Sequence, residues 1–513
     1  MGHTAHGGEG EVHITGGNIY AYNFANQWGI SSSAIGGGGS ANALGSNGAV
    51  EITGGYVYAY SALGTAIGGG SSLNTNGGNA TVKITGGYVI AKSGKSNGIG
   101  GGMGGTSSGS NGGSANIRIS GNPIIRTGSI GGGKTQNTTG TIGTADIAVS
   151  GGDTQAQFVM AAGAGIKPTF TMTGGTVRNS DTSDKEYYHV QPHGGAVYLE
   201  DGTFKMSAGE IVNCSAIRGG AVYIKGDAST TFTMSGGQIY DCMAIKNPSS
   251  SIDPHGGAVY LEGGEVSLSD GSIFDNLANG GHGGGIYITD GNFEMTGEYT
   301  QLLGNSAIYR DGKGGHGGAL YVTSSNNAQV SVLSGTISEN SSDRLGGGIC
   351  VDMGNSDKTA EVTIGQTGSG NLPSIISNHT ILSGGGLFVR GSKANVTIKG
   401  GKIAENTTSA YVVNENVANE KGMVSLEDEN VTTHVTVTFD GNGGTTEGNA
   451  ALSTQHIVTA TNSLLVTPTF TRAGYKFIGW NTRADGYGDG DYNDGKVMNI
   501  QTDLTLYAQW KIN

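Results

Sequence analysis

Four histidines stand directly in front of a glycine pair that recurs along the chain. These histidines are His193, His255, His282 and His316. The string His-Gly-Gly-Ala-Val-Tyr-Leu-Glu occurs at 193–200 and again, letter for letter, at 255–262. A column of imidazoles at one corner of a repeat could bind a metal ion, or could exchange protons with Asp201, Asp253 or Asp290. The first functional hypothesis is therefore a repeated histidine site.

Other copies of the same phrase lack the imidazole. They begin with Arg218, Leu345 and Ser383. Because the position accepts a cation, an alkyl chain and a hydroxyl, we interpret it as a turn position whose side chain stacks on the next repeat. The sequence accordingly predicts no metal site and no cofactor.

Carboxylates follow several of these phrases, at Glu200, Glu262, Asp290 and Asp352. Glycoside hydrolases use two carboxyl groups about 5–10 Å apart. A polysaccharide-active enzyme, a hydrolase or a lyase, with a site on the lateral face is therefore the alternative function. The four residues belong to different repeats, however, so a solvated face is the preferred interpretation.

Two longer loops, 178–193 and 244–255, are where the enzyme hypothesis would place its site. They contribute Asp181, Asp184, Glu186 and Tyr187 near His193, and Asp253 near His255. The sequence identifies no catalytic residue among them.

A tyrosine follows the glycine pair at the same position in five successive copies: Tyr198, Tyr223, Tyr260, Tyr287 and Tyr321. Rings that repeat at about 4.8 Å would form a flat aromatic strip. Sugars stack on such strips, so these five residues are the predicted ligand-binding site. The alternative is a structural ladder, in which stacking between neighbouring strands stabilises the repeat.

The spacing of the repeat predicts the fold. Its glycine pairs begin at 194, 219, 256, 283, 317, 346 and 384, with spacings of 25 to 38 residues, which is typical of a solenoid. A second phrase, an alternating strand that ends in Gly-Gly, occurs at 12–17 and 50–55. Together the phrases predict an all-β, right-handed parallel β-helix of roughly thirteen coils. It spans 1–430, with Gly/Ser-rich coils at 1–165 and coils of the Gly-Gly-Ala-Val-Tyr type at 166–430.

Aligned copies predict which side chains stack. Two apolar columns are predicted to point inward: Val197, Val222, Val259, Ile286, Leu320, Ile349 and Leu387, and, two residues on, Leu199, Ile224, Leu261, Ile288, Val322, Val351 and Val389. A corner column contains Cys214, Cys242, Asn276, Asn305, Asn340, Asn378 and Asn406. Its amides are expected to hydrogen-bond along the axis. The two cysteines are expected to be buried thiols, with a disulfide as the alternative.

Composition narrows the class of protein. The chain has 513 residues, with 98 Gly, 7 Pro and 13% charged residues, and no Gly-X-Y period that would indicate collagen. Its net charge of −13, without basic patches, predicts no nucleic-acid partner. No run approaches the roughly 18 apolar residues of a membrane span, so no membrane insertion is expected. The start lacks a signal peptide and enters a repeat directly, which suggests a segment of a longer protein.

The pattern changes over 431–513. This region contains the landmarks 435–444, 472–480 and 503–510, in that order. They closely resemble the Listeria–Bacteroides repeat, also called the internalin B-type repeat. The resemblance implies a small β-grasp-like module that acts as a spacer or weak binding unit in secreted or surface proteins, usually bacterial.

The repeat region is similar to bacterial surface proteins with pectate-lyase-like helices and Gly-Gly-Ala-Ile-Tyr phrases, among them adhesins and polymorphic outer-membrane proteins. The two resemblances imply an extracellular bacterial protein, either secreted or associated with the cell wall or cell surface. The expected function is adhesion or glycan contact rather than catalysis. Host or microbial glycans or surface proteins are the expected partners.

Overall fold

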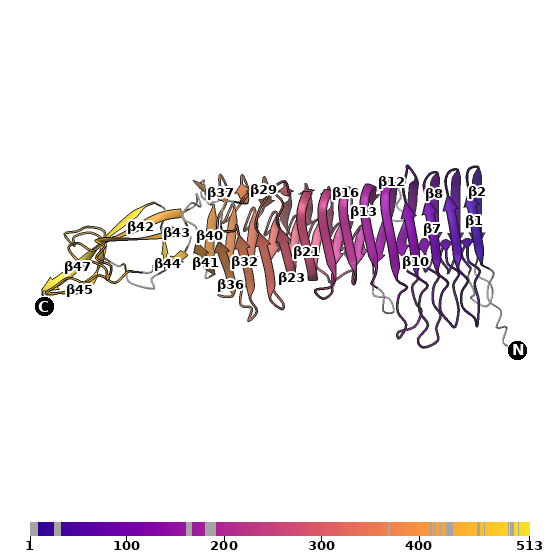
Figure 1. Cartoon of the computed structure of the whole chain (residues 1–513), viewed down its shortest axis with the longest axis horizontal. Coiled ribbons are helices and arrows are strands. Elements are labelled where there is room, and N and C mark those ends of the chain that lie inside the picture. The colour runs from indigo at the N-terminus through magenta and orange to yellow at the C-terminus, as the bar shows by residue number, and fades with distance from the viewer. Residues whose placement is uncertain are drawn as a thin grey trace.

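The computed structural model describes residues 9–24, 32–160, 167–179, 191–367, 370–409, 413–414, 416–420, 422–426, 434–458, 462–465, 467–490, 492, 497–500 and 502–512. Within these residues the chain forms strands and no helix, so no described helix could cross a membrane. A 31-stranded sheet and a 10-stranded sheet hold the repeats, and two small sheets lie near the C-terminus. Figure 1 shows the repeat strands side by side along one long axis. The prediction of an all-β fold with parallel strands is confirmed.

The first-phrase strands form one continuous parallel series. They are β1 (Gly10–Ile14), β4 (Gly48–Ile52), β7 (Ala80–Ile84), β10 (Ala115–Ile119), β12 (Ala145–Met160), β13 (Thr169–Arg178), β16 (Thr203–Val212), β19 (Thr231–Tyr240), β21 (Val259–Phe274), β23 (Ile286–Met295), β28 (Ala328–Val332), β32 (Ala360–Ile364), β36 (Ala394–Ile398) and β41 (Met423–Leu426). Each pairs with its equivalent in the next repeat unit. Val12 lies opposite Val50, for example, and Val362 lies opposite Val396.

The same large sheet contains two further series. One comprises β2 (Asn18–Asn23), β5 (Tyr56–Ser61), β8 (Tyr88–Ser93), β11 (Ile124–Gly131), β24 (Gln301–Leu303), β29 (Thr336–Ser338), β33 (Ser374–Ile376) and β37 (Lys402–Ala404). The glycine-phrase series comprises β3 (Ile35–Gly36), β6 (Ile67–Gly68), β9 (Ile99–Gly100), β15 (Val197–Leu199), β18 (Val222–Ile224), β27 (Leu320–Val322), β31 (Ile349–Asp352), β35 (Leu387–Arg390) and β40 (Val417–Glu420). The long strands β12 to β23 contribute segments to more than one series.

The 10-stranded sheet runs beside the corner that precedes the glycine phrase. Its strands are β14 (Gln191–His193), β17 (Ser215–Arg218), β20 (Met243–Ile245), β22 (Leu277–Asn279), β25 (Ser306–Arg310), β26 (Lys313–Gly314), β30 (Ser341–Ser342), β34 (His379–Thr380), β38 (Thr407–Thr408) and β39 (Val413–Asn414). Most pair in parallel, whereas β25 and β26 form an antiparallel hairpin. Residues 306–308 of β25 still pair in parallel with β22, and 306–307 pair with β30, so the hairpin projects beside a continuous stack.

Apolar side chains of successive units stack in the interior. Both apolar columns expected to point inward are fully buried, so that prediction is confirmed. Phe158, Phe170, Phe204 and Phe232 form another column, with ring centroids 4.5–4.7 Å apart. These rings and the aliphatic columns belong to a single core that extends from Ile14 to Val417.

Asparagines form a buried ladder at one corner, as the sequence predicts. The side-chain amide of Asn276 donates to Oδ1 of Asn305 at 2.9 Å, and that of Asn305 donates to Oδ1 of Asn340 at 3.0 Å. The series continues through Asn378 and Asn406 at 2.9 Å per step. In the two preceding units Cys214 and Cys242 occupy the position as free, buried thiols, so the expectation of thiols is confirmed.

The residue before each rung turns the corner. It has a positive φ in every case: Asn213, Asp241, Asp275, Gly304, Glu339, Ser377 and Glu405, with φ between 51° and 64°. This left-handed conformation strains the backbone of any residue that has a side chain.

Glycine runs in the N-terminal units pack backbone against backbone. A Cβ added to Gly102 would lie 2.0 Å from the carbonyl oxygen of Gly70. The N–H of Gly102 donates to the carbonyl of Gly78, and the N–H of Gly113 donates to that of Gly102, both at 2.8 Å. No side chain fits at this separation, which accounts for much of the glycine content. These contacts hold the run 100–113 against the neighbouring units.

A separate core lies near the C-terminus. It is formed by Val435, Val437, Phe439, Leu465, Phe470, Trp480, Ile500, Leu506 and Ala508. The strands here are β42 (His434–Asp440), β43 (Leu452–Val458), β44 (Asn462–Leu464), β45 (Tyr475–Asn481), β46 (Val497–Asn499) and β47 (Leu504–Ile512). Four of them form a mixed sheet in the order β43-β42-β47-β45, and β44 pairs with β46. Figure 1 places this unit beyond β41, at the end of the stack opposite β1.

We predict that Asn340→Ala lowers the free energy of unfolding by about 3 kcal/mol. The amide of Asn340 bonds Asn378 and the carbonyl of Leu302, and its Oδ1 accepts from Asn305, all in a fully buried setting. Each buried group left unpaired costs about 1–3 kcal/mol. Denaturant unfolding followed by circular dichroism measures the change.

Asn395→Ala is the matched control. Asn395 is only partly buried and donates one side-chain bond, to Glu361 at 2.7 Å, so we expect a loss below about 1 kcal/mol. Equal losses for the two variants would contradict a stabilising ladder.

Candidate functional site

The five predicted site tyrosines do lie in one register column. Tyr198, Tyr223, Tyr260, Tyr287 and Tyr321 occupy paired positions of successive strands. Successive ring centroids are 5.6, 5.4, 4.9 and 5.2 Å apart, and the rings are close to parallel.

The tyrosine column is not an open strip. Tyr223, Tyr260, Tyr287 and Tyr321 are 3, 4, 9 and 7% exposed, and Tyr198 is half-buried. The faces of the rings therefore contact other rings, and little of the surface of Tyr223, Tyr260, Tyr287 and Tyr321 is accessible to solvent. The assignment of these residues as a ligand site stays a prediction.

The histidines form a second column beside the tyrosines. His193 lies 4.3 Å from the ring of Tyr223, and His255 lies 4.5 Å from that of Tyr287. At the copy that lacks histidine, the Arg218 guanidinium lies 5.1 Å from the ring of Tyr260. A planar group thus packs against the tyrosine of the following unit in each case. These contacts agree with the interpretation of the position as a stacked turn residue.

Burial keeps these imidazoles neutral. Desolvation lowers the pKa of His255 and of His316 to about 3, and that of His282 to about 4. Nδ1 of His282 and Nδ1 of His316 are buried and have no hydrogen-bond partner among the described residues. Neutral imidazoles with a free nitrogen can still donate or accept a hydrogen bond.

Of the other sequence candidates, Asp253 lines one groove together with His255, His282 and His316. In the part of the chain that is described, no group of three or more His, Cys, Asp or Glu side chains is arranged to hold a metal ion. Asp181, Asp184, Glu186 and Tyr187 lie outside the described residues.

The expectation that the carboxylates form a solvated face is wrong for Asp352. That residue is 8% exposed and pairs with Arg390, whose Nε lies 2.8 Å from Oδ1 of the carboxylate. The two residues are opposite each other in paired strands, which is why a buried charge is tolerated here. Glu262, in turn, accepts a hydrogen bond from the hydroxyl of Tyr223.

An exposed aromatic face lies instead on β2, β5 and β8 and includes the residue directly after β2. It consists of Tyr20, Tyr22, Phe24, Tyr56, Tyr58, Tyr60 and Tyr88. Tyr20, Tyr22 and Phe24 are 60, 54 and 71% exposed, whereas Val57 and Ala59 on the opposite face of the sheet are fully buried. We call this set the aromatic face.

Cross-strand contacts hold the rings of the aromatic face together. Tyr22 lies 5.5 Å from Tyr58, and Tyr56 lies 5.7 Å from Tyr88 with the planes nearly parallel. The sequence contains the signal for this face: aromatic residues at every second position, alternating with small apolar ones. Alignment on the glycine phrase did not select it, because that phrase has no tyrosine in these units.

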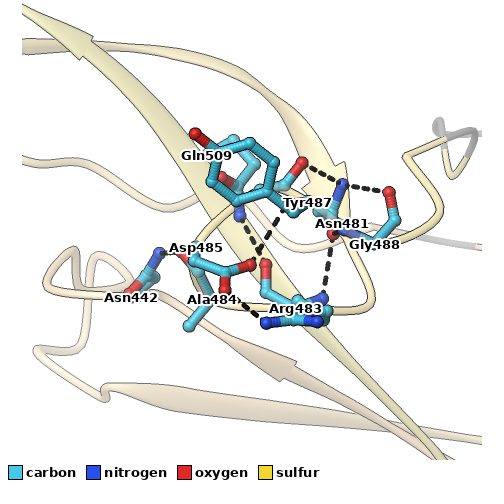
Figure 2. Close-up of polar contacts among 9 residues, drawn as sticks. Asn442, Asn481, Arg483, Ala484, Asp485, Tyr487, Gly488 and Gln509 are labelled. Carbon is cyan, nitrogen blue, oxygen red and sulfur yellow. Dashed lines mark hydrogen bonds and ion pairs between the residues drawn. The ribbon is translucent and has the colours of Figure 1, made fainter.

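The C-terminal unit carries one well-defined loop. Asn481 is 5% exposed, and its amide donates to the carbonyls of Gly486 and Gly488 at 3.1 and 2.9 Å. Asp485 accepts from Arg483 and from the N–H of Tyr487, and these two groups hold the pKa of its carboxyl below the usual value. Figure 2 shows this network around the loop. Tyr487 itself is 88% exposed.

The buried imidazoles predict a pH-dependent stability. An imidazole with a pKa of about 3 when folded and about 6.5 when unfolded binds its proton mainly in the unfolded chain between those values. Stability is therefore fully present above pH 6.5 and falls as the pH drops toward 3, by about 1.4 kcal/mol per pH unit for each such group.

His316→Gln tests this effect, because glutamine keeps a planar polar group that does not titrate. We expect the slope of the unfolding free energy between pH 6 and pH 4 to become shallower by about one proton. An unchanged slope in denaturant unfolding would show that His316 does not remain neutral in the folded protein.

Comparisons with known proteins identify the C-terminal unit. Residues 436–509 match the Listeria-Bacteroides repeat domain, so the prediction of this module within 431–513 is confirmed. Repeats of this kind are typical of surface proteins. The match covers the small C-terminal core and the loop drawn in Figure 2.

One curated relative adds a partial similarity. A protein described as a putative Gly-rich membrane protein, from Evansella cellulosilytica, is 40% identical over 78 residues. The alignment covers 15% of this chain and 9% of that protein, so the chain spans less than a tenth of its relative's length. No solved structure shows a significant match. The family assignment thus applies to the C-terminal repeat domain.

Proposed function

We propose that this chain is part of an extracellular bacterial protein, secreted or attached to the cell surface, that contacts glycans. In this proposal residues 1–430 form a right-handed parallel β-helix of roughly thirteen coils, and 431–513 act as a spacer module. The parallel register from Val12 to Val396 and the match at 436–509 support it. The partial likeness to a Gly-rich membrane protein agrees with a surface location.

The aromatic face is the observation that carries the glycan proposal. Seven aromatic rings project from one side of three neighbouring strands, and three of them are more than half exposed. Aromatic rings offer a flat apolar surface on which the C–H face of a pyranose can pack, and tyrosine adds a hydroxyl for hydrogen bonding. Exposed aromatic patches on otherwise polar surfaces mark interaction sites.

The tyrosine column that begins at Tyr198 has a smaller role in this proposal. Its rings stack on one another and on the histidine column, so no pyranose can lie flat on them. A ligand would contact the half-buried Tyr198 or the edges of Tyr287 and Tyr321. We place the main contact on the aromatic face.

The enzymatic alternative has no specific observation in its favour. Asp253, which lies in the predicted loop 244–255, is paired with Lys313 at 2.9 Å and with Lys246 at 3.3 Å. The two ammonium groups hold the pKa of Asp253 below its usual value, which does not suit a general acid.

We predict that Tyr20→Ala combined with Tyr22→Ala weakens glycan binding more than tenfold. Both rings are over half exposed, so the variant should keep its fold while it loses the stacking surface. Binding is measured on a polysaccharide and glycan array, followed by titration with the best oligosaccharide.

Tyr299→Ala is the control for loss of an exposed tyrosine elsewhere, since Tyr299 is 73% exposed and lies outside the aromatic face. It should bind as the unmodified chain does. Full binding by the double variant would rule out this face, and an array that shows only protein partners would redirect the proposal to protein adhesion.

A further inference from the structure

A groove lies between the β25–β26 hairpin and the histidine and tyrosine columns. In the hairpin, Tyr309 lies opposite Gly314 and Arg310 lies opposite Lys313. The groove has a volume of 380 Å³, and the rings of Tyr287 and Tyr321 form part of its lining. Pockets of this size accept one sugar unit or a comparably small molecule.

Arg344 carries a positive charge in this groove that no carboxylate among the described residues neutralises. Its guanidinium packs over the ring of Tyr309 at 4.9 Å, its Nε is buried without a hydrogen-bond partner, and it forms no ion pair with a described carboxylate. Arg390, by contrast, is bonded to Asp352. A partly buried guanidinium without a counter-ion favours an anionic ligand, because desolvating a lone charge is costly.

The other cation in the groove, Lys313, already has a carboxylate partner. Lys313 donates to both carboxylate oxygens of Asp253, at 2.9 Å each. Lys246 shares the same carboxylate from the neighbouring pocket, so among the described residues the cations around the groove outnumber the carboxylates, which favours an anionic ligand. The planar fork of a guanidinium binds a carboxylate with two parallel hydrogen bonds.

Neutral polar groups complete the lining. His282 and His316 both face the groove, and the buried Nδ1 atom of each lacks a partner among the described residues. Leaving such atoms unbonded is unfavourable, so a ligand with hydroxyl groups would gain hydrogen bonds from them. The ring of Tyr309 is 42% exposed and provides an apolar surface beside them.

We propose that this groove binds a carboxylate-bearing sugar unit. Arg344 pairs with the carboxylate, His282 and His316 bond the hydroxyls, and Tyr309 packs against the C–H face of the ring. The inference rests on the proposed glycan contact for the source of its ligand. The site, however, is formed by different residues from those of the aromatic face.

Titration of the full chain with sodium glucuronate, with calorimetry as the readout, tests the proposal. Glucose is the matched ligand without a carboxylate, and inorganic phosphate tests for a general anion site. We expect glucuronate to bind at least tenfold more tightly than glucose and than phosphate. Equal binding of glucose, or tighter binding of phosphate, would overturn the assignment.

Variants locate the site. Arg344→Gln should weaken glucuronate binding at least tenfold. Arg344→Lys keeps the positive charge but loses the planar guanidinium, so its affinity should lie between those of the unmodified chain and Arg344→Gln. Arg310→Gln is the control, since Arg310 belongs to the same hairpin but lines the neighbouring pocket and bonds Asn279. It should bind within about twofold of the unmodified chain. Unchanged affinity in both Arg344 variants would contradict the proposal.

The double variant Tyr20→Ala and Tyr22→Ala separates this inference from the proposed function. It should bind glucuronate as well as the unmodified chain while losing binding at the aromatic face. Loss of glucuronate binding in that variant would indicate that acidic sugars bind at the aromatic face. It would contradict the assignment of the groove as their binding site.

Discussion

In-register stacking is the constraint on which the rest of this structure depends. Each residue of a parallel strand has its counterpart in the next repeat unit about 4.8 Å away, so a side chain must be compatible with its own copy. Phenylalanine meets this condition by ring stacking, as between Phe170 and Phe204 at 4.7 Å. Asparagine meets it by passing one hydrogen bond along the axis, as between Asn305 and Asn340. Glycine meets it by having no side chain to accommodate.

Contacts between equivalent residues of successive units could be predicted from the sequence. Alignment of the repeats shows which residue occupies the same position in the next unit along the stack. The asparagine ladder and the two inward apolar columns are of this kind. Lateral neighbours could not. Nothing in the alignment shows that Arg218 lies over Tyr260, and this sideways packing is what closes the tyrosine column to solvent. Contacts between different columns depend on how the corner turns, and residues such as Glu339, at φ 58°, give no local signal for that turn.

Charge pairing shows the same limit. Asp352 was expected on a solvated face because the four carboxylates belong to different repeats, yet its partner is Arg390, one unit further along. The aromatic face was visible in the sequence as alternating tyrosines but was not singled out, because its units lack the Gly-Gly-Ala-Val-Tyr phrase. The candidate sites thus lie where the chain departs from its most regular repeat. One is in the glycine-rich units near β2, and the other is where the β25–β26 hairpin leaves the stack.

Disulfide trapping tests the in-register stacking most directly. Thr363 and Thr397 lie opposite each other on β32 and β36 and point away from the core, so cysteines at both positions should be within bonding distance. A chain with Thr363→Cys and Thr397→Cys is predicted to form the bond readily under mild oxidation. The offset pair Thr363→Cys and Asn395→Cys, displaced by two residues, should stay reduced. Faster bonding of the offset pair would contradict the register and the account built on it.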